Sequence, residues 1–396
     1  MIGGSNAAAE LSGLDRWSDP APAVSSEERL RRIDRARALM KEQGVDALLI
    51  GAGPSLSYFT GIGWGMIERL VAMVLTPRGE PFLICPTFEV GSLEAILPIP
   101  VETRLWEEDE DPFRQVAGIL RQERSTQLAI DPDLPFGMVE QLRSAGTSCA
   151  VVNAATIVNG CRAIKSAAEL ALLRQAKRMT LEVQRRAARI LRPGIRASEV
   201  ATFIDQAHKA VGSAGSTFCI VQFGTSTAFP HGLPADDLLQ EGNMVLIDTG
   251  CAVQGYQSDI TRSYVFGTPS AEQRRIWDIE REAQIALFEA ARPGVTCEDL
   301  DGTARRTLMR HGLGPDYALP GLPHRSGHGI GLSIHEAPYL VRGDRTVLRP
   351  GMCLSDEPTI VVPGAFGVRL EDHFHVTEDG AAWFTEPSQA IDRPFD

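Results

Sequence analysis

The sequence predicts two domains of different class, an α/β domain followed by an α+β domain. The chain has 396 residues, which favours two or three domains, each with its own core. Before about residue 155, short apolar segments alternate with helical ones, which is typical of a sheet flanked by helices. After residue 160, amphipathic helices come in pairs, and the strands between them end in acidic residues. This pattern favours outer helices around a bent antiparallel sheet.

The N-terminal α/β domain is expected over residues 26–155, after a flexible lead at 1–25 that is rich in small residues and proline. Ser25 and Ser26 can cap a helix that runs to about residue 42 and ends at Gly44. The other expected elements are strands at 46–50, 70–75, 81–85, 127–130 and 149–152, and helices at 113–123 and 134–145.

The C-terminal domain is expected over residues 160–396. The second of its helices has Val200, Phe203, Ile204 and Ala207 at helical spacing. The expected elements before the acidic strands are helices at 166–191, 197–211, 270–291 and 296–311, and a strand at 217–223.

The first predicted hairpin of this domain carries two aspartates. Asp248 ends an apolar run, and Asp259 begins the next strand. A loop centred near Val253 would bring the two carboxylates face to face, because directly opposed residues of an antiparallel pair share one face roughly 5 Å apart.

A second hairpin carries two glutamates. Glu357 and Glu371 are symmetric about residues 363–364, so they are also expected to oppose each other. Asp356 precedes Glu357 and should point to the opposite face, because side chains alternate along a strand.

Four carboxylates in one pocket would repel one another severely without cations. Two divalent ions, with about +4 against about −4, would nearly neutralise the pocket. Carboxylates with one imidazole, here His328, suit Mn²⁺, Co²⁺ or Zn²⁺. A pair of such ions can activate water and polarise a carbonyl. The sequence therefore predicts a dinuclear metal site rather than separate surface carboxylates.

The motifs and their order resemble those of the two-domain pita-bread metallopeptidases, Xaa-Pro dipeptidase (prolidase) and Xaa-Pro aminopeptidase. The resemblance implies a creatinase/prolidase-like α/β domain and a creatinase/aminopeptidase-like catalytic domain with the pita-bread fold. The motifs that carry it are Phe229–Gly232, Leu246–Gly250, Gly255–Arg262, Gly327–Gly331, Ile334–Pro338, Asp356–Pro358 and Gly367–Asp372.

The resemblance also implies roles for individual residues. Asp259 and Glu371 would bridge two divalent metal ions, Asp248 would bind one of them, and His328 with Glu357 would bind the other. We expect Mn²⁺, with Co²⁺ and Zn²⁺ as alternatives, and no organic cofactor. Glu357 would also act as general base. The remaining residues expected to act in catalysis are His231, His324, His335 and Arg369.

These expectations lead to a metal-dependent Xaa-Pro dipeptidase that acts on small dipeptides. Two alternatives stay open: an Xaa-Pro aminopeptidase acting on longer peptides, and a same-fold amidohydrolase of a small ring or amide compound, such as an ectoine hydrolase. A dipeptidase must recognise the proline carboxylate, to which Arg369, His231 or a loop arginine such as Arg342 could contribute.

Composition limits the partners. The net charge of −12, from 39 basic and 51 acidic side chains, argues against a nucleic-acid partner. The acidic run Glu107–Asp111 is expected to be a solvated loop. No stretch approaches the length of an apolar membrane span, so no membrane partner is expected.

The cysteines and one aromatic segment support two further expectations. The seven cysteines are scattered without a CxxC motif, which favours free thiols and a cytoplasmic location. We expect a homodimer in which Trp64, within Tyr58–Gly65, lines the pocket of the neighbouring subunit.

Overall fold

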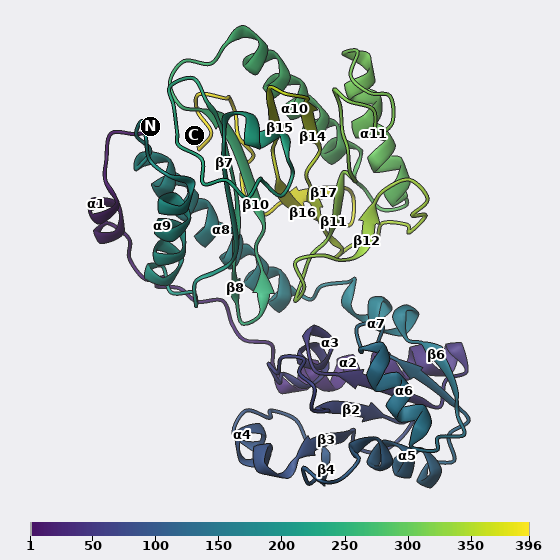
Figure 1. Cartoon of the computed structure of the whole chain (residues 1–396). Helices are drawn as coiled ribbons and strands as arrows, with labels where there is room; N and C mark the ends of the chain where they lie inside the picture. The colour runs from purple at the N-terminus through teal and green to yellow at the C-terminus, as the bar shows by residue number, and fades with distance from the viewer. Residues whose placement is uncertain (1, 396) are drawn as a thin grey trace. The chain divides into compact units, whose positions relative to one another are not determined.

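A computed structural model describes residues 2–395 and divides them into two compact units (Figure 1). One unit runs from Val24 to Arg162. The other combines the described residues up to Ala23 with those from Ala163 onward.

The unit from Val24 to Arg162 is a six-stranded sheet with helices, in the strand order β4-β3-β2-β1-β5-β6. Strand β2 is antiparallel to β1 and β3, and the other neighbours are parallel. This arrangement confirms the predicted α/β class. The strands are β1 (Ala47–Gly51), β2 (Ala72–Leu75), β3 (Phe82–Pro86), β4 (Glu102–Trp106), β5 (Gln127–Ile130) and β6 (Ala150–Asn153). The helices are α2 (Ser26–Gln43), α3 (Pro54–Thr60), η1 (Thr87–Glu89), α4 (Val90–Glu94), α5 (Pro112–Gln122), α6 (Phe136–Ser144) and α7 (Ala155–Arg162).

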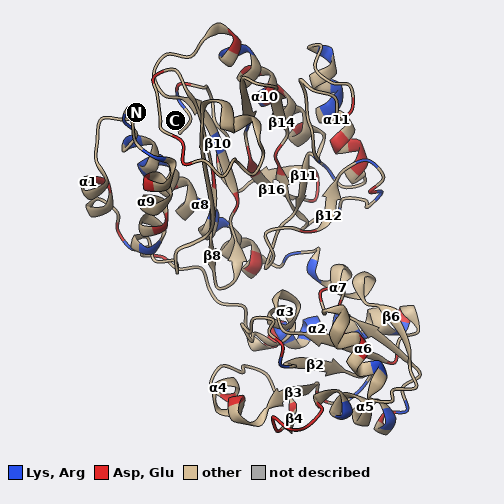
Figure 2. Ribbon diagram, viewed as in Figure 1, with Lys and Arg blue, Asp and Glu red and all other residues tan. Residues whose placement is uncertain are grey.

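Strand β4 was not predicted, because it is a polar edge strand. Its five residues include Glu102 and Arg104, and only Trp106 is buried. Such a strand lacks the apolar run that marks the buried strands β1 and β3. The loop Glu107–Asp111 that follows it is exposed and drawn largely in red in Figure 2, which confirms the predicted solvated loop.

Helices α3 and α7 were also missed. Helix α3 begins with Pro54 and ends at Gly61, whose φ of 85° is left-handed. It contains Tyr58, and Trp64 lies beyond it, half-buried. The role of Trp64 in a dimer stays a prediction.

The second unit places helix pairs outside antiparallel sheets, as predicted. Among the described residues these sheets have the orders β10-β8-β7, with β9 also paired to β8, then β12-β11-β13-β16-β17, and β14-β15. The helices are α8 (Ala167–Arg189), α9 (Ala197–Ala210), α10 (Ala271–Ala290) and α11 (Cys297–Arg310), and η2 (Gly224–Ala228) follows β7. The strands are β7 (Ser216–Phe223), β8 (Met244–Val253), β9 (Tyr256–Gln257), β10 (Ile260–Val265), β11 (Gly327–Gly329), β12 (Glu336–Leu340), β13 (Cys353–Asp356), β14 (Thr359–Val362), β15 (Phe366–Arg369), β16 (Asp372–Val376) and β17 (Ala381–Trp383).

Two apolar layers hold the helices against the sheets. Val183 of α8 and Phe203 of α9 pack with Ile247 of β8 in one buried cluster. Leu287 of α10 and Leu300 of α11 pack with Phe374 of β16 in another. Apolar burial of this kind supplies most of the stability of a domain, at roughly 25 cal/mol per Å².

The leading segment differs from the flexible lead expected for residues 1–25. It contains helix α1 (Ala7–Ser12), and Leu11, Leu14 and Trp17 pack against the cluster of α8 and α9. Glu10 is buried and pairs with Arg186 at 3.1 Å. The few apolar residues are too widely spaced to show a helical or strand period, so only their packing reveals this role.

Among the described residues, no helix is both long and apolar enough to cross a bilayer.

Candidate metal centre

The first acidic hairpin forms, but its predicted register is wrong. Strand β10 pairs with β8 so that Asp248 opposes Thr261 rather than Asp259. The reason is the turn at Gln254-Gly255, where both residues have positive φ, 50° and 85°. A two-residue turn of this kind matches the strand twist and moves the centre of the hairpin by one residue. Asp259 therefore lies diagonally from Asp248, just before β10.

The second acidic hairpin has the predicted register. Thr359 opposes Arg369, and on the other side Asp356 opposes Asp372. Glu357 and Glu371 therefore lie opposite each other between the two paired segments. Asp356 is fully buried. Burial raises its pKa most, and the nearby charge of Glu280 on α10 raises it further. It does not line the cavity described below, as the alternation of the strand predicts.

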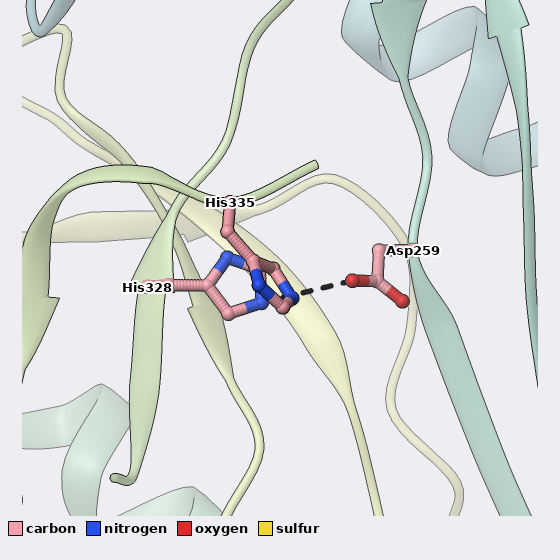
Figure 3. Close-up of side chains that lie close together, drawn as sticks. All are labelled: Asp259, His328 and His335. Carbon is pink, nitrogen blue, oxygen red and sulfur yellow. Dashed lines mark ion pairs between the residues drawn. The ribbon is translucent and has the colours of Figure 1, made fainter. Parts of the chain in front are cut away.

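Three of these carboxylates converge on His328 of β11. Its Nε2 lies 3.3 Å from Oε1 of Glu357, 3.6 Å from Oδ2 of Asp259 and 3.9 Å from Oε1 of Glu371. Figure 3 shows His328 and His335 on the same side of Asp259, with a dashed line marking the approach of His328 to Asp259.

The imidazole of His328 is set up as a neutral ligand. Its Nδ1 lies 3.0 Å from the backbone oxygen of Gly329, and since a carbonyl can only accept, Nδ1 carries the hydrogen. Burial lowers the pKa of His328 to about 3, so the ring is neutral at physiological pH. The lone pair is therefore on Nε2, which has no hydrogen-bond partner among the described residues.

The carboxylates are destabilised as anions. Burial raises the pKa of Glu357 to about 7, and burial together with the neighbouring acids raises the pKa values of Asp259 and Glu371 well above their usual range. Oδ1 of Asp248 and Oε1 of Glu371 are buried without a hydrogen-bond partner among the described residues. Buried anions with unpartnered oxygens beside a neutral imidazole fit divalent cations well.

Residues that could hold a metal ion form three overlapping groups among those described: Asp259 with His328 and His335, Asp259 with Glu371 and His373, and His328 with Glu357 and Glu371. His373 of β16 thus lies beside the centre, and both of its ring nitrogens are buried without a hydrogen-bond partner among the described residues. Its proximity results from the pairing of β16 with β13, which sequence alternation did not indicate.

Asp248 has a different environment from the other acids. Nη2 of Arg369 donates to its Oδ2 at 2.6 Å. Nε of Arg369 donates to Oγ1 of Thr261 at 3.1 Å, and that hydroxyl donates to Glu371 at 2.8 Å. Arg369 and Thr261 thus connect Asp248 on β8 to Glu371, and hold the two hairpins together.

The centre forms one wall of a cavity of about 670 Å³. His231, His324 and His335 line it, as do the five predicted ligands and Arg369. The other lining residues include an apolar set and one arginine, Phe218, Ile220, Pro230, Pro323, Ile334 and Arg325. Its volume is in the usual range for small-ligand sites.

Two of the cavity histidines are held in the neutral form. Burial lowers the pKa of His324 to about 4 and lowers that of His335 as well. Nδ1 of His324 lies 2.7 Å from the backbone oxygen of Arg325 and must donate to it, so neutral His324 keeps an acceptor at Nε2.

Sequence reasoning missed the apolar lining residues and one charged residue, Arg325, which lies three positions before His328. Arg342, which the sequence offered as a carboxylate contact, pairs instead with Asp316 and does not line the cavity. A loop arginine has no sequence pattern that tells which of these environments it occupies.

Comparison with known proteins gives two family matches. The model of metallopeptidase family M24 matches residues 171–378, and that of the creatinase/prolidase N-terminal domain matches residues 32–164.

The chain is also similar to individual members. It is 33% identical over 372 residues to the Xaa-Pro dipeptidase of Lactobacillus helveticus, covering 91% of this chain and 98% of that protein. The crystal structure of dipeptidase PepE from Mycobacterium ulcerans superposes with a TM-score of 0.86 at 34% identity, covering 94% of this chain and 99% of that one. The prolidase of Pyrococcus horikoshii superposes with a TM-score of 0.81 at 29% identity, covering 91% and 99%.

Proposed function

Because the chain belongs to metallopeptidase family M24, we propose that it is a metal-dependent peptidase that hydrolyses Xaa-Pro dipeptides. The observation that carries the proposal is a convergence of carboxylate and imidazole atoms on one wall of a partly apolar cavity, several of them without a hydrogen-bond partner among the described residues. The name of the Lactobacillus helveticus relative, Xaa-Pro dipeptidase, supports the choice of substrate.

We assign the ligands as predicted from the sequence: Asp248, Asp259, His328, Glu357 and Glu371. Four of them belong to the groups that could hold an ion. For the fifth, Asp248, the support is the unpartnered Oδ1, which Arg369 leaves open while it holds Oδ2. When bound, two divalent ions would lower the pKa of water and polarise the substrate carbonyl.

Residues of the chain would handle the protons. Glu357 can accept a proton from the attacking water and release it to the leaving proline nitrogen. His335 stays neutral and can donate a hydrogen bond to the developing oxyanion. His324 would accept a hydrogen bond through Nε2, and His231 would complete the polar wall.

The apolar part of the cavity would hold the proline ring. Phe218, Ile220 and Ile334 lie on its wall. A peptide bond to proline has no N–H, so the site must grip the ring rather than a backbone donor.

The test is a substrate panel with Mn²⁺: Ala-Pro, Ala-Pro-Ala and ectoine. We expect cleavage of Ala-Pro above all, loss of activity with a chelator, and recovery with Mn²⁺. Preferred cleavage of Ala-Pro-Ala would make the protein an aminopeptidase, and opening of ectoine alone would make it an amidohydrolase. Full activity of metal-free protein would contradict the proposal.

The proposal includes three finer points. We propose Mn²⁺ as the native metal, to be checked by metal analysis of protein purified without chelators. We propose a cytoplasmic location, supported by seven cysteines that are all free thiols. We also propose a homodimer, to be checked by sedimentation.

A further inference from the structure

His373 of β16 is a buried histidine whose ring makes no hydrogen bond within the described part of the chain. Its side chain is inaccessible to solvent, and both ring nitrogens lack a partner there. Its cross-strand neighbour is Ser355, whose Oγ already accepts from the backbone N–H of His328 at 2.7 Å. Because a buried polar group without a partner costs free energy, the ring is expected to bind something that the polypeptide does not supply.

Another fully buried histidine shows how a purely structural imidazole is accommodated in this domain. His208 of α9 is as inaccessible as His373. Its Nε2 lies 3.0 Å from Oγ1 of Thr180, and its Nδ1 lies 2.8 Å from Oγ of Ser216. Both nitrogens of His208 therefore have a partner, as is usual for buried polar groups. His373 differs in having neither, so a role as a satisfied core residue does not explain it.

The ring of His373 lies at metal-binding distance from two carboxylates of the centre. Its Nε2 is 4.0 Å from Oε1 of Glu371, which is too far for a hydrogen bond. Oε1 of Glu371 also has no hydrogen-bond partner among the described residues. Two atoms held by one ion at about 2.1 Å each are at most about 4.2 Å apart, so one ion can bind both. One ligand atom each from His373, Glu371 and Asp259 lie within 4.8 Å of one another.

His373 and His328 reach the centre from different strands. His328 lies on β11 and forms its own group with Glu357 and Glu371. The ring centroids of the two histidines are 6.2 Å apart. His373 does not line the substrate cavity, whereas His335 does. A nitrogen from His373 could therefore bind an ion without filling the space that a substrate needs.

We propose that His373 is a sixth protein ligand of the centre, and that one of its ring nitrogens binds an ion that is also held by Asp259 and Glu371. This inference rests on the proposed function, to which it adds a second imidazole donor. Imidazole suits Zn²⁺ better than it suits Mn²⁺, for which carboxylate oxygens are the preferred donors. The second imidazole should therefore strengthen the binding of Zn²⁺ more than that of Mn²⁺.

The experiment counts the histidines that bind metal. The chain has only eight histidines, so ¹⁵N-histidine labelling and NMR of the protein loaded with Zn²⁺, which is diamagnetic, can follow each ring. Wild type should show zinc-bound nitrogens on two histidines. His373→Phe should lose one of these signals. The matched control is His375→Phe, two positions further along β16, where the ring is only partly buried and belongs to none of the ion-binding groups of described residues. It should keep both signals.

Calorimetric titration gives a second measurement. His373→Phe should bind Zn²⁺ at least tenfold more weakly at one of the two positions, with a smaller loss for Mn²⁺. If His373→Phe does not fold, His335→Gln decides, because His335 is the remaining histidine in the ion-binding groups of described residues and is exposed. Both zinc-bound signals should persist in His335→Gln.

The outcomes separate this inference from the proposed function. A single zinc-bound histidine in wild type, or two that both persist in His373→Phe, would overturn the role of His373 while metal binding and peptidase activity stood. Loss of the second signal in His335→Gln would assign that signal to His335 and would also overturn it. A wild-type protein that binds neither Zn²⁺ nor Mn²⁺ would instead contradict the proposed function itself.

Discussion

Replacing Glu357 by Gln should change the stability of the metal-free protein in a pH-dependent way. Burial raises the pKa of Glu357 from 4.5 to about 7, which corresponds to on the order of 3 kcal/mol. A raised carboxyl pKa favours the folded state at low pH, and this contribution is lost as pH rises through about 7. Gln keeps the shape without the charge. In chelator, the variant should therefore gain on the order of 3 kcal/mol relative to wild type between pH 4.5 and pH 8.

The assay is urea unfolding of both proteins across this pH range, first in chelator and then with saturating Mn²⁺. In Mn²⁺ the order should reverse at neutral pH, because wild type keeps all its ligands and binding to the native state stabilises it. Glu378→Gln, at an exposed position of the same domain, is the control and should follow wild type throughout. A stability difference that is independent of pH, or an equal gain from Mn²⁺ in both proteins, would refute the electrostatic account of Glu357.

Three further predictions concern the framework of the centre. Burial lowers the pKa of His208 to about 4, so its stabilising contribution is complete above pH 6.5 and is lost as pH falls towards 4. In urea unfolding, wild type should therefore lose on the order of 3 kcal/mol of unfolding free energy over this range that His208→Gln does not lose. Asp372→Asn leaves Arg262 fully buried and unpaired and should cost about 3–5 kcal/mol in thermal unfolding, whereas Asp392→Asn at the exposed pair with Arg274 should cost under about 1 kcal/mol. A Cβ at Gly250 would lie 1.8 Å from the carbonyl oxygen of Ser258, so Gly250→Ala should displace the Asp259 segment. Calorimetry should then show weaker Mn²⁺ binding. The control Gly91→Ala, whose added Cβ would have no atom within 4 Å, should bind Mn²⁺ as wild type does.

Much of the framework could be read from local pattern. The helices at 166–191 and 270–291 have capping serines, Ser166 and Ser270, that the structure shows in complete capping boxes. The register of the glutamate hairpin follows from symmetry about its turn, because only three residues connect the paired residues Val362 and Phe366. Signals of this kind lie within a few residues of each other, where backbone geometry decides the outcome.

Other features were not visible in the local pattern or depended on residues far apart in the sequence. The centre of the aspartate hairpin lies one position later than expected, because the turn at Gln254-Gly255 fixes its register. Strand β4 forms through pairing with β3 although its own residues are largely polar. The leading segment is not the flexible lead expected, because Leu11 and Trp17 pack against the apolar cluster of α8 and α9.

The sequence by itself indicated which side chains carry the chemistry: acidic residues at the ends of strands, with one imidazole between them, can coexist as buried anions only around cations. Only the tertiary structure decided the protonation of these groups and which arginine side chains pair with a carboxylate of the protein. Arg369, Arg342 and Arg325 look alike along the chain, yet the first is bound to Asp248, the second to Asp316, and the third faces the cavity. The physical reason is that burial and the nearness of other charges set protonation and pairing, and both depend on segments brought together by folding.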